Sequence, residues 1–276
     1  MFRHGRPPRT AIDRKATTTT SILLPTLLGQ TKMPPNEAVA PGERMPTEDL
    51  PGYFATGQSA LKAVQLAQLA ARKPGFVSIL DMACGHGRVL RWLQAAFPDA
   101  RLTACDLLRD GVDFCASTFG AKPVYSIPTP SSEMFPDRYD LIWVGSLLTH
   151  LDADQWVNFI KLWHDVLAPD GLLVVTTHGE LVAERMRNGN HYGYLPPSIA
   201  RTLRTFHHAG FAFLEASTDQ IDYGISLARP EWVIRRFLTY PDFRVVLLTE
   251  ALWANHQDVV AVVKRPLDGR VAERPD

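Results

Sequence analysis

Two glycines and an aspartate that follows them are spaced for binding a nucleotide. Gly85 and Gly87 lie between a short apolar run that ends at Leu80 and a segment, 88–97, whose apolar residues recur at helical spacing. Glycine has no Cβ and tolerates positive φ, so the backbone there can approach a ligand while the free N–H groups of the helix start face it. Asp106 ends the next predicted strand, where a carboxylate accepts hydrogen bonds from ribose hydroxyls. The pattern therefore predicts a nucleotide-like cofactor at this turn.

The glycine turn lacks the third glycine of a dinucleotide fingerprint. That fingerprint is G-x-G-x-x-G, whereas Gly87 is followed by Arg88, Val89 and Leu90. The remaining pattern, Asp81-x-Ala-Cys-Gly-x-Gly, resembles motif I of class I S-adenosylmethionine-dependent methyltransferases. The resemblance implies S-adenosylmethionine as the cofactor and methyl transfer as the activity. An NAD(P)-dependent oxidoreductase and a non-catalytic S-adenosylmethionine-binding regulator remain as alternatives.

The same resemblance implies roles for individual residues around the cofactor. Asp81 is expected near the aminoacyl end of the cofactor, Gly85 and Gly87 beneath it, and Asp106 on the ribose diol. Any doubly wound sheet also carries glycine in its first turn and acids at strand ends, so a purely structural reading stays open. The further predicted cofactor contacts are Ala83, which stands where many members have a glycine, Cys84, Leu107, Gly145 and Ser146.

Three of the nine histidines lie beside predicted strand ends, where ligands bind in open α/β sheets. His150 follows the fourth strand, His178 follows the fifth, and His256 precedes the last. Methyl transfer to an oxygen of high pKa needs a base, and histidine titrates near neutral pH. We expect His178 to be this base. His150 could also be a base, but its pattern favours a residue that shapes the cofactor pocket, and His256 is equally consistent with a functional role and with a hydrogen-bonded turn.

The elements that must position these residues alternate between strand and helix, as a doubly wound sheet requires. Some 60 residues separate the fifth strand from the last two, which would form an antiparallel hairpin. The sequence thus predicts an α/β fold: a doubly wound, mostly parallel seven-stranded sheet, an antiparallel C-terminal edge hairpin, and an inserted α/β cap after the fifth strand. The predicted strands are 76–80, 102–106, 122–126, 140–144, 172–177, 243–248 and 259–263.

Composition divides the chain into five predicted segments. Residues 1–52, rich in basic residues and prolines, are predicted to be a disordered extension. The cofactor-binding core is expected at 53–179, an inserted cap or substrate region at 180–229, the C-terminal part of the core at 230–266, and a flexible tail at 267–276.

Two questions about the N-terminal region stay open from the sequence. The basic, acid-poor start could be an organellar transit peptide, or the chain could begin at Met33. Tyr53, which precedes the predicted helix ending near Arg72, could close over the cofactor or pack in the core.

Overall charge and cysteine content restrict the partners. Lys plus Arg and Asp plus Glu number 29 each, so nothing draws the chain toward nucleic acid or an anionic membrane, and no apolar run is long enough to span a bilayer. The three cysteines do not suggest a disulfide framework, so we expect a cytoplasmic protein. No carboxylate-rich cluster indicates a metal site. The oligomeric state is left open.

The acceptor is predicted to be a hydroxylated small molecule or a glycan. Methyltransferases acting on amino groups of adenine, cytosine or glutamine resemble one another in an Asp/Asn-Pro-Pro-aromatic motif after the fourth strand, where this chain has Gly-Ser-Leu-Leu at 145–148. The stretches 222–233 and 256–260 more loosely resemble bacterial methyltransferases associated with surface-glycan or small-metabolite modification. We therefore expect O-methylation.

Overall fold

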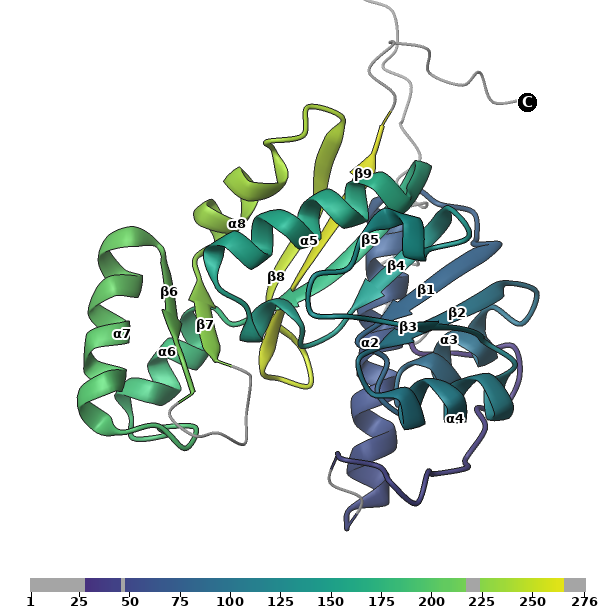
Figure 1. Ribbon diagram of the computed structural model, residues 1–276, viewed down its shortest axis with the longest axis horizontal. Coiled ribbons are helices and arrows are strands. Elements are labelled where there is room, and N and C mark those ends of the chain that lie inside the picture. Colours follow the sequence, from purple (N-terminus) through teal and green to yellow (C-terminus); the bar gives the residue numbers. More distant parts are fainter. Residues whose placement is uncertain (1–27, 46–47, 217–223, 266–276) are drawn as a thin grey trace, which may run out of the picture.

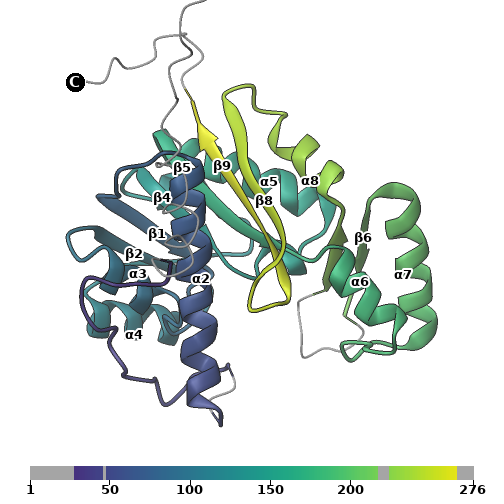
Figure 2. The same cartoon turned by 180° about the vertical axis from the view of Figure 1, so that it is seen from behind.

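The computed structural model describes residues 28–45, 48–216 and 224–265. A central sheet carries helices on both faces, and a smaller lobe projects beside it (Figures 1 and 2). Much of the predicted N-terminal extension, the whole predicted tail, and residues 222 and 223 of the second resemblance lie outside the described residues. No helix in the described part of the chain combines the length and apolarity needed to cross a membrane.

The sheet has seven strands in the order β3-β2-β1-β4-β5-β9-β8. Strands β1 to β5 run parallel, and β9 runs antiparallel between β5 and β8. This confirms the predicted doubly wound sheet with its antiparallel edge hairpin. Strand order reverses between β1 and β4, and ligands bind outside the carboxyl ends of strands at such a point. The strands are β1 (Ser78–Met82), β2 (Arg101–Asp106), β3 (Lys122–Tyr125), β4 (Tyr139–Val144), β5 (Leu167–Thr177), β8 (Phe243–Trp253) and β9 (Gln257–Lys264).

Helices cover both faces of the sheet, and two short 3-10 turns interrupt the loops around β4. One face packs against α2, α3 and α4, and the other against α5 and α8. The bounds are α2 (Leu50–Ala70), α3 (Leu90–Ala96), α4 (Arg109–Phe119), α5 (Ala153–Val166), α8 (Pro230–Phe237), η1 (Ser132–Met134) and η2 (Leu148–His150).

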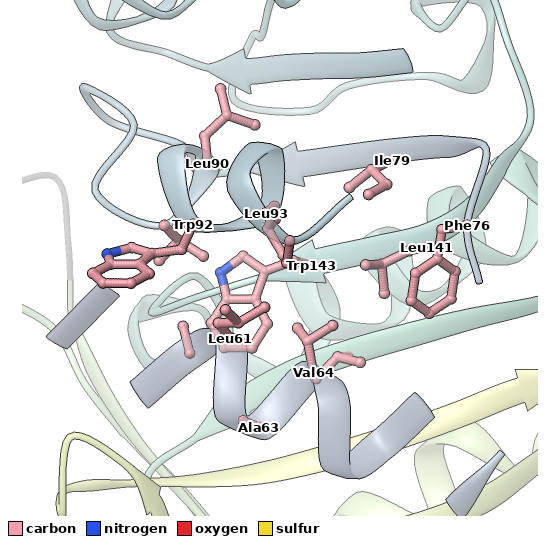
Figure 3. Close-up of a cluster of buried hydrophobic side chains, with 14 of the residues drawn as sticks. Leu61, Ala63, Val64, Phe76, Ile79, Leu90, Trp92, Leu93, Leu141 and Trp143 are labelled. Atoms are coloured by element: carbon pink, nitrogen blue, oxygen red, sulfur yellow. The ribbon is translucent and has the colours of Figure 1, made fainter. Parts of the chain in front are cut away.

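Successive strand residues supply the two faces in turn, because side chains alternate along a strand. In β1, Ile79 packs on the α2 side and Leu80 on the α5 side. Figure 3 shows Trp143 of the sheet beside Leu61 of α2, and Ile79 and Val64 belong to the same cluster. Fully burying an aliphatic or aromatic side chain of this kind contributes about 1.5–3 kcal/mol. The two cores thus hold the strand ends in a fixed position.

The lobe beyond β5 has its own small core. It consists of α6 (Glu180–Arg187), α7 (Pro196–Ala209) and a two-stranded antiparallel sheet of β6 (Phe211–Leu214) and β7 (Ile225–Ala228). Figure 1 shows these elements beside β8, away from β1 to β3. This confirms an α/β cap inserted after the fifth strand. Its core is formed by Val182, Ala183, Met186, Ile199, Phe206, Ala212, Ile225 and Leu227.

Residues 28–45 have a defined place in the fold, whereas their composition predicts disorder. The fully buried Arg91 side chain donates from Nη1 to the carbonyl oxygens of Asn36 at 2.9 Å and Ala38 at 2.8 Å. Its Nε donates to the Gly87 carbonyl at 3.1 Å. A buried guanidinium is costly unless its donors find acceptors. Residues 36 and 38 of the N-terminal segment supply these acceptors as backbone carbonyls. Every residue has such a carbonyl, so the amino-acid composition of the segment does not indicate the contact.

Candidate functional site

The two glycines of the turn after β1 serve different purposes. Gly85 has φ +51°, and a Cβ placed on it would meet no heavy atom within 4 Å. Gly87 has φ +78°, and a Cβ there would lie 2.5 Å from the Phe119 ring and 3.0 Å from Cys115 Sγ. Gly87 is therefore needed for the approach of α4. Gly85 faces open space, as a residue passing beneath a ligand must.

Asp106 is brought to the glycine turn. Its Oδ2 accepts the Gly85 N–H at 2.8 Å, and its Oδ1 accepts the Leu108 N–H at 2.9 Å. A carboxylate oxygen can accept more than one hydrogen bond, so both oxygens keep capacity for hydroxyl donors. Cys84 is buried and Leu107 is exposed. The predicted acid and the predicted turn thus form one unit.

Asp81 and Arg88 both lie next to this turn with their charges incompletely matched. Asp81 is 1% exposed, and its Oδ2 has no hydrogen-bond partner among the described residues. Burial raises the pKa of Asp81, and the charge of Asp106 raises it further. The Arg88 guanidinium lies 5.9 Å from the centre of the Tyr53 ring and 5.8 Å from that of Trp253, and its charge lowers the pKa of Asp81 in turn.

Sequence reasoning missed Arg88. The available signal was its place directly after the second glycine, two residues before α3. Burial lowers the pKa of Arg88, while Tyr53, Glu43 and Asp81 raise it. Ala83, with φ +63°, lies on the same turn as these groups.

Tyr53 is buried between the N-terminal segment and two arginines. Its hydroxyl donates to Glu43 Oε2 at 2.6 Å and accepts from Arg91 Nη2 at 3.3 Å. Burial and the Glu43 carboxylate raise the pKa of Tyr53. Of the two interpretations left open by the sequence, these contacts favour core packing beside the turn.

At the carboxyl ends of β4 and β5, buried side chains form a closed hydrogen-bonded ring with β9. The Ser146 N–H donates to Thr176 Oγ1 at 2.8 Å, Thr176 Oγ1 donates to Gln257 Oε1 at 2.6 Å, and Gln257 Nε2 donates to Ser146 Oγ at 2.6 Å. A Cβ on Gly145 would lie 3.0 Å from the Trp253 ring. Gly145 and Ser146 are therefore held by the scaffold at the strand ends.

The three predicted histidines gather at this same edge, and a tyrosine joins them. The ring centres of His178 and His256 are 5.2 Å apart. The ring of Tyr192, on the loop between α6 and α7, lies 5.8 Å from His256 and 6.5 Å from His178. His150 is close enough to influence the titration of His178, and its Nδ1 lies 2.9 Å from the Gly224 carbonyl. Sequence reasoning missed Tyr192, which no strand end marks.

Burial keeps these imidazoles neutral. It lowers the pKa of His178 to about 3, with smaller contributions from His256 and His150. It also lowers the pKa of His150. The pKa of His256 is lowered by burial and by the charge of Arg185. At neutral pH each imidazole therefore offers one N–H donor and one nitrogen acceptor.

The described part of the chain has a cavity that lies away from this edge. Within the described ranges, no group of three His, Cys, Asp or Glu side chains could hold a metal ion. A cavity of about 540 Å³ is lined by Ser78, Arg101 and Lys122, the first residues of β1, β2 and β3. It therefore lies at the opposite edge of the sheet from the glycine turn and the histidines.

Comparison with known proteins agrees with this geometry. Residues 79–171 match a family model described as a methyltransferase domain. Over 109 residues the chain is 31% identical to the N-terminal Xaa-Pro-Lys N-methyltransferase 1 of Danio rerio. This match covers 37% of this chain and 48% of the relative. The chain thus spans about half the length of the curated relative it matches.

Two solved structures share the fold at low sequence identity. An S-adenosylmethionine-dependent methyltransferase from Clostridium acetobutylicum ATCC 824 has a TM-score of 0.53 at 11% identity, covering 79% of this chain and 93% of its own. The plantazolicin methyltransferase BpumL has a TM-score of 0.52 at 13% identity, covering 79% and 87%. With the strand order and the glycine turn, these matches show that the chain has the Rossmann-like fold of these methyltransferases.

Proposed function

We propose that this protein transfers a methyl group from S-adenosylmethionine to a hydroxyl of a small molecule or glycan. The observation that carries the cofactor assignment is the turn after β1: open space beside Gly85, next to a buried carboxylate and a half-buried guanidinium that have no hydrogen-bonded counter-charge among the described residues. The matched family model and the S-adenosylhomocysteine bound in the BpumL structure support it.

The residues present fit this cofactor. Asp106 is placed for the ribose hydroxyls and the Gly85 backbone for close approach, while Asp81 would meet the ammonium group and Arg88 the carboxylate. When bound, the cofactor supplies a methyl group on a sulfonium whose positive charge disappears on transfer. The protein therefore has to align the acceptor and exclude water.

We infer that His178 holds the acceptor proton. Its Nδ1 is buried and has no hydrogen-bond partner among the described residues. Burial lowers the pKa of the ring to about 3, so the imidazole is neutral at pH 7 but a weaker base than a free histidine. We expect His178→Ala to lower turnover by about 10²-fold or more, as loss of a general base does, while cofactor affinity stays nearly intact. An equal loss of both would assign His178 a structural role.

Partners and compartment follow from charge and cysteine chemistry. We infer a small-molecule or glycan acceptor, rather than nucleic acid or membrane, because the charges balance at 29 of each sign. Cys84, Cys105 and Cys115 are free and buried, which suits the cytoplasm. An amine acceptor is the second candidate, since the Danio rerio relative is named as an N-methyltransferase.

Calorimetry with S-adenosylhomocysteine tests the cofactor site. We expect binding by the intact chain, and loss of about tenfold or more in affinity for Asp106→Ala and Gly85→Val. Gly120→Val is a matched control, because Gly120 also has positive φ, at +66°, and no atom within 4 Å of a built Cβ, but lies at the end of α4. Equal affinity of the Gly85 and Gly120 variants, or no heat with the intact chain, would contradict the proposal.

Transfer of label from methyl-labelled S-adenosylmethionine to a metabolite or glycan extract then tests catalysis. Binding of S-adenosylhomocysteine without any labelled product would favour the regulator that the sequence left open.

A further inference from the structure

We propose that His178, Tyr192 and His256 together form the acceptor site, and that this trio selects a neutral hydroxyl over a protonated amine. We call the three side chains the acceptor cluster. The inference rests on the proposed function and deepens it. It depends on which atoms of the cluster donate a hydrogen bond and which accept one.

His256 presents a donor because Arg185 fixes its tautomer. Arg185 Nη1 lies 2.6 Å from His256 Nδ1, and Nη2 donates to the Asn255 carbonyl at 2.8 Å. A guanidinium can only donate, so Nδ1 must accept and the ring proton must sit on Nε2. A second proton on the ring would place two cations in contact. Burial and the Arg185 charge lower the pKa of His256 accordingly.

The turn that carries His256 is set by local backbone geometry. The His256 N–H donates to the Trp253 carbonyl at 3.0 Å, and the two residues between them, Ala254 and Asn255, have φ of +54° and +51°. Two successive positive φ values are typical of the type I′ turn that joins tightly paired strands. The β8–β9 hairpin thus points Arg185 and His256 at one another from separate elements.

His178 presents an acceptor. The Ser226 backbone carbonyl interacts with its imidazole and raises the pKa, as a group that accepts the ring N–H does. Because Nδ1 has no hydrogen-bond partner among the described residues, we assign the Ser226 contact to Nε2. Nδ1 therefore carries the lone pair. It is buried, and it lies in the ring next to His256.

Tyr192 presents a hydroxyl that nothing in the described chain engages. Its oxygen is buried without a hydrogen-bond partner there, although its backbone N–H is held by Asn190 Oδ1 at 3.2 Å. The residue has φ +51°, which a large side chain rarely adopts. Buried polar atoms without partners are uncommon because desolvation is not compensated. Two of them, on neighbouring rings, indicate that a ligand completes this cluster.

A hydroxyl group complements all three rings. It donates its proton to His178 Nδ1, and its oxygen accepts from His256 Nε2 and from the Tyr192 hydroxyl. An ammonium can only donate, so it would leave the His256 N–H without an acceptor. It would also place a second positive charge near Arg185 in a buried site, which is unfavourable. A carboxylate can only accept, so it leaves His178 Nδ1 unmatched. Asp258, two residues after His256, already accepts the Ala251 N–H at 2.9 Å.

The transfer that follows from this arrangement is balanced. The hydroxyl oxygen bonds to the methyl carbon, the carbon–sulfur bond breaks with its electron pair kept by sulfur, and the hydroxyl proton passes to His178 Nδ1. Tyr192 and His256 position the oxygen. His178 alone takes part in the proton movement.

Nitrogen NMR of histidine-labelled protein tests the tautomers without any acceptor. We expect His256 to show the neutral Nε2–H form from pH 5.5 to 8. Arg185→Met should raise the pKa of His256 toward, but not to, the value of about 6.5 of a free imidazole, because burial still lowers it. A His256 that titrates in the intact protein, or that carries its proton on Nδ1, would overturn the inference.

The chemical class of the product tests the selectivity. The intact protein is incubated with methyl-labelled S-adenosylmethionine and a metabolite extract, and residual S-adenosylmethionine is removed by chromatography. The labelled products are then passed over a cation exchanger in acid and treated with alkali. We expect label in material that is not retained and that survives alkali, as an ether does. Retained label, as in a methylated amine, or label released by alkali, as in a methyl ester, would overturn the inference.

Tyr192→Phe removes one hydrogen bond and no charge. We expect the initial rate of labelling, at limiting extract, to fall about tenfold, the upper size for one hydrogen bond between neutral groups. Tyr194→Phe, on the same loop but outside the cluster, should keep the intact rate, and both variants should bind S-adenosylhomocysteine as the intact protein does. Binding of S-adenosylhomocysteine without product of any class would overturn the acceptor site. Absence of that binding would instead refute the proposed function.

Discussion

Replacing Arg91 by Met should destabilise the protein strongly. Arg91 is fully buried and makes hydrogen bonds to the carbonyls of Gly87, Asn36 and Ala38 and to the Tyr53 hydroxyl. Removing one member of a buried charged network costs about 3–5 kcal/mol, because the remaining groups lose their partners while the original desolvation is not fully recovered. We therefore expect the free energy of unfolding to fall by about that amount, and cofactor affinity to fall with it, since Gly87 is on the glycine turn.

Urea denaturation followed by tryptophan fluorescence measures this loss. The Glu43 side chain is 4% exposed and bonds to Tyr53, which bonds to Arg91, so Arg91→Met with Glu43→Gln should cost less than the sum of the two single changes. Arg204→Met, on the exposed side of α7, is the control and should change stability by no more than about 0.5 kcal/mol. A loss below about 1 kcal/mol for Arg91→Met, or additive costs with Glu43→Gln, would refute this account of residues 28–45.

Further predictions concern two titrating groups and the glycine turn. Burial raises the pKa of Asp258 from 3.8 to about 6, so above pH 6 the ionised carboxylate lowers the free energy of unfolding. Asp258→Asn should therefore stabilise the protein at pH 7.5 by about 1–3 kcal/mol, and this gain should shrink toward pH 4. No gain at pH 7.5 in urea denaturation would contradict this. Burial lowers the pKa of His178 from 6.5 to about 3, so its contribution to stability is present above pH 6.5 and is lost as pH falls toward 3. His178→Gln should therefore make the free energy of unfolding fall less steeply between pH 6.5 and pH 3. An unchanged pH dependence would count against the burial of His178. Gly87→Ala should lower the free energy of unfolding by about 1–3 kcal/mol more than Gly85→Ala does, because only the Cβ added at Gly87 would lie 2.5 Å from the Phe119 ring. Equal losses of stability in thermal or urea unfolding would show that α4 adjusts freely.

Local patterns in the sequence were enough to predict the sheet and its first turn. Continuous apolar runs in the strands, helical spacing between them, and glycines that need positive φ are properties of short segments, so they can be recognised without knowing what lies across the fold. The capping box of α5, in which Asp152 accepts the Gln155 N–H at 2.8 Å, is of the same kind. The placing of His150, His178 and His256 at strand ends also follows from chain order, because parallel strands end at one edge.

The remaining features arise from contacts between distant segments, which no local pattern records. Arg91 orders residues 28–45 through backbone carbonyls, which every sequence possesses, so the composition of that segment is uninformative. Arg185 fixes the tautomer of His256 across 71 residues, and Tyr192 reaches the histidines from a loop inside the cap. Chain order was sufficient to say where chemistry could occur. Which nitrogen donates and which accepts was decided only by the tertiary structure, because that property belongs to the neighbour and not to the residue.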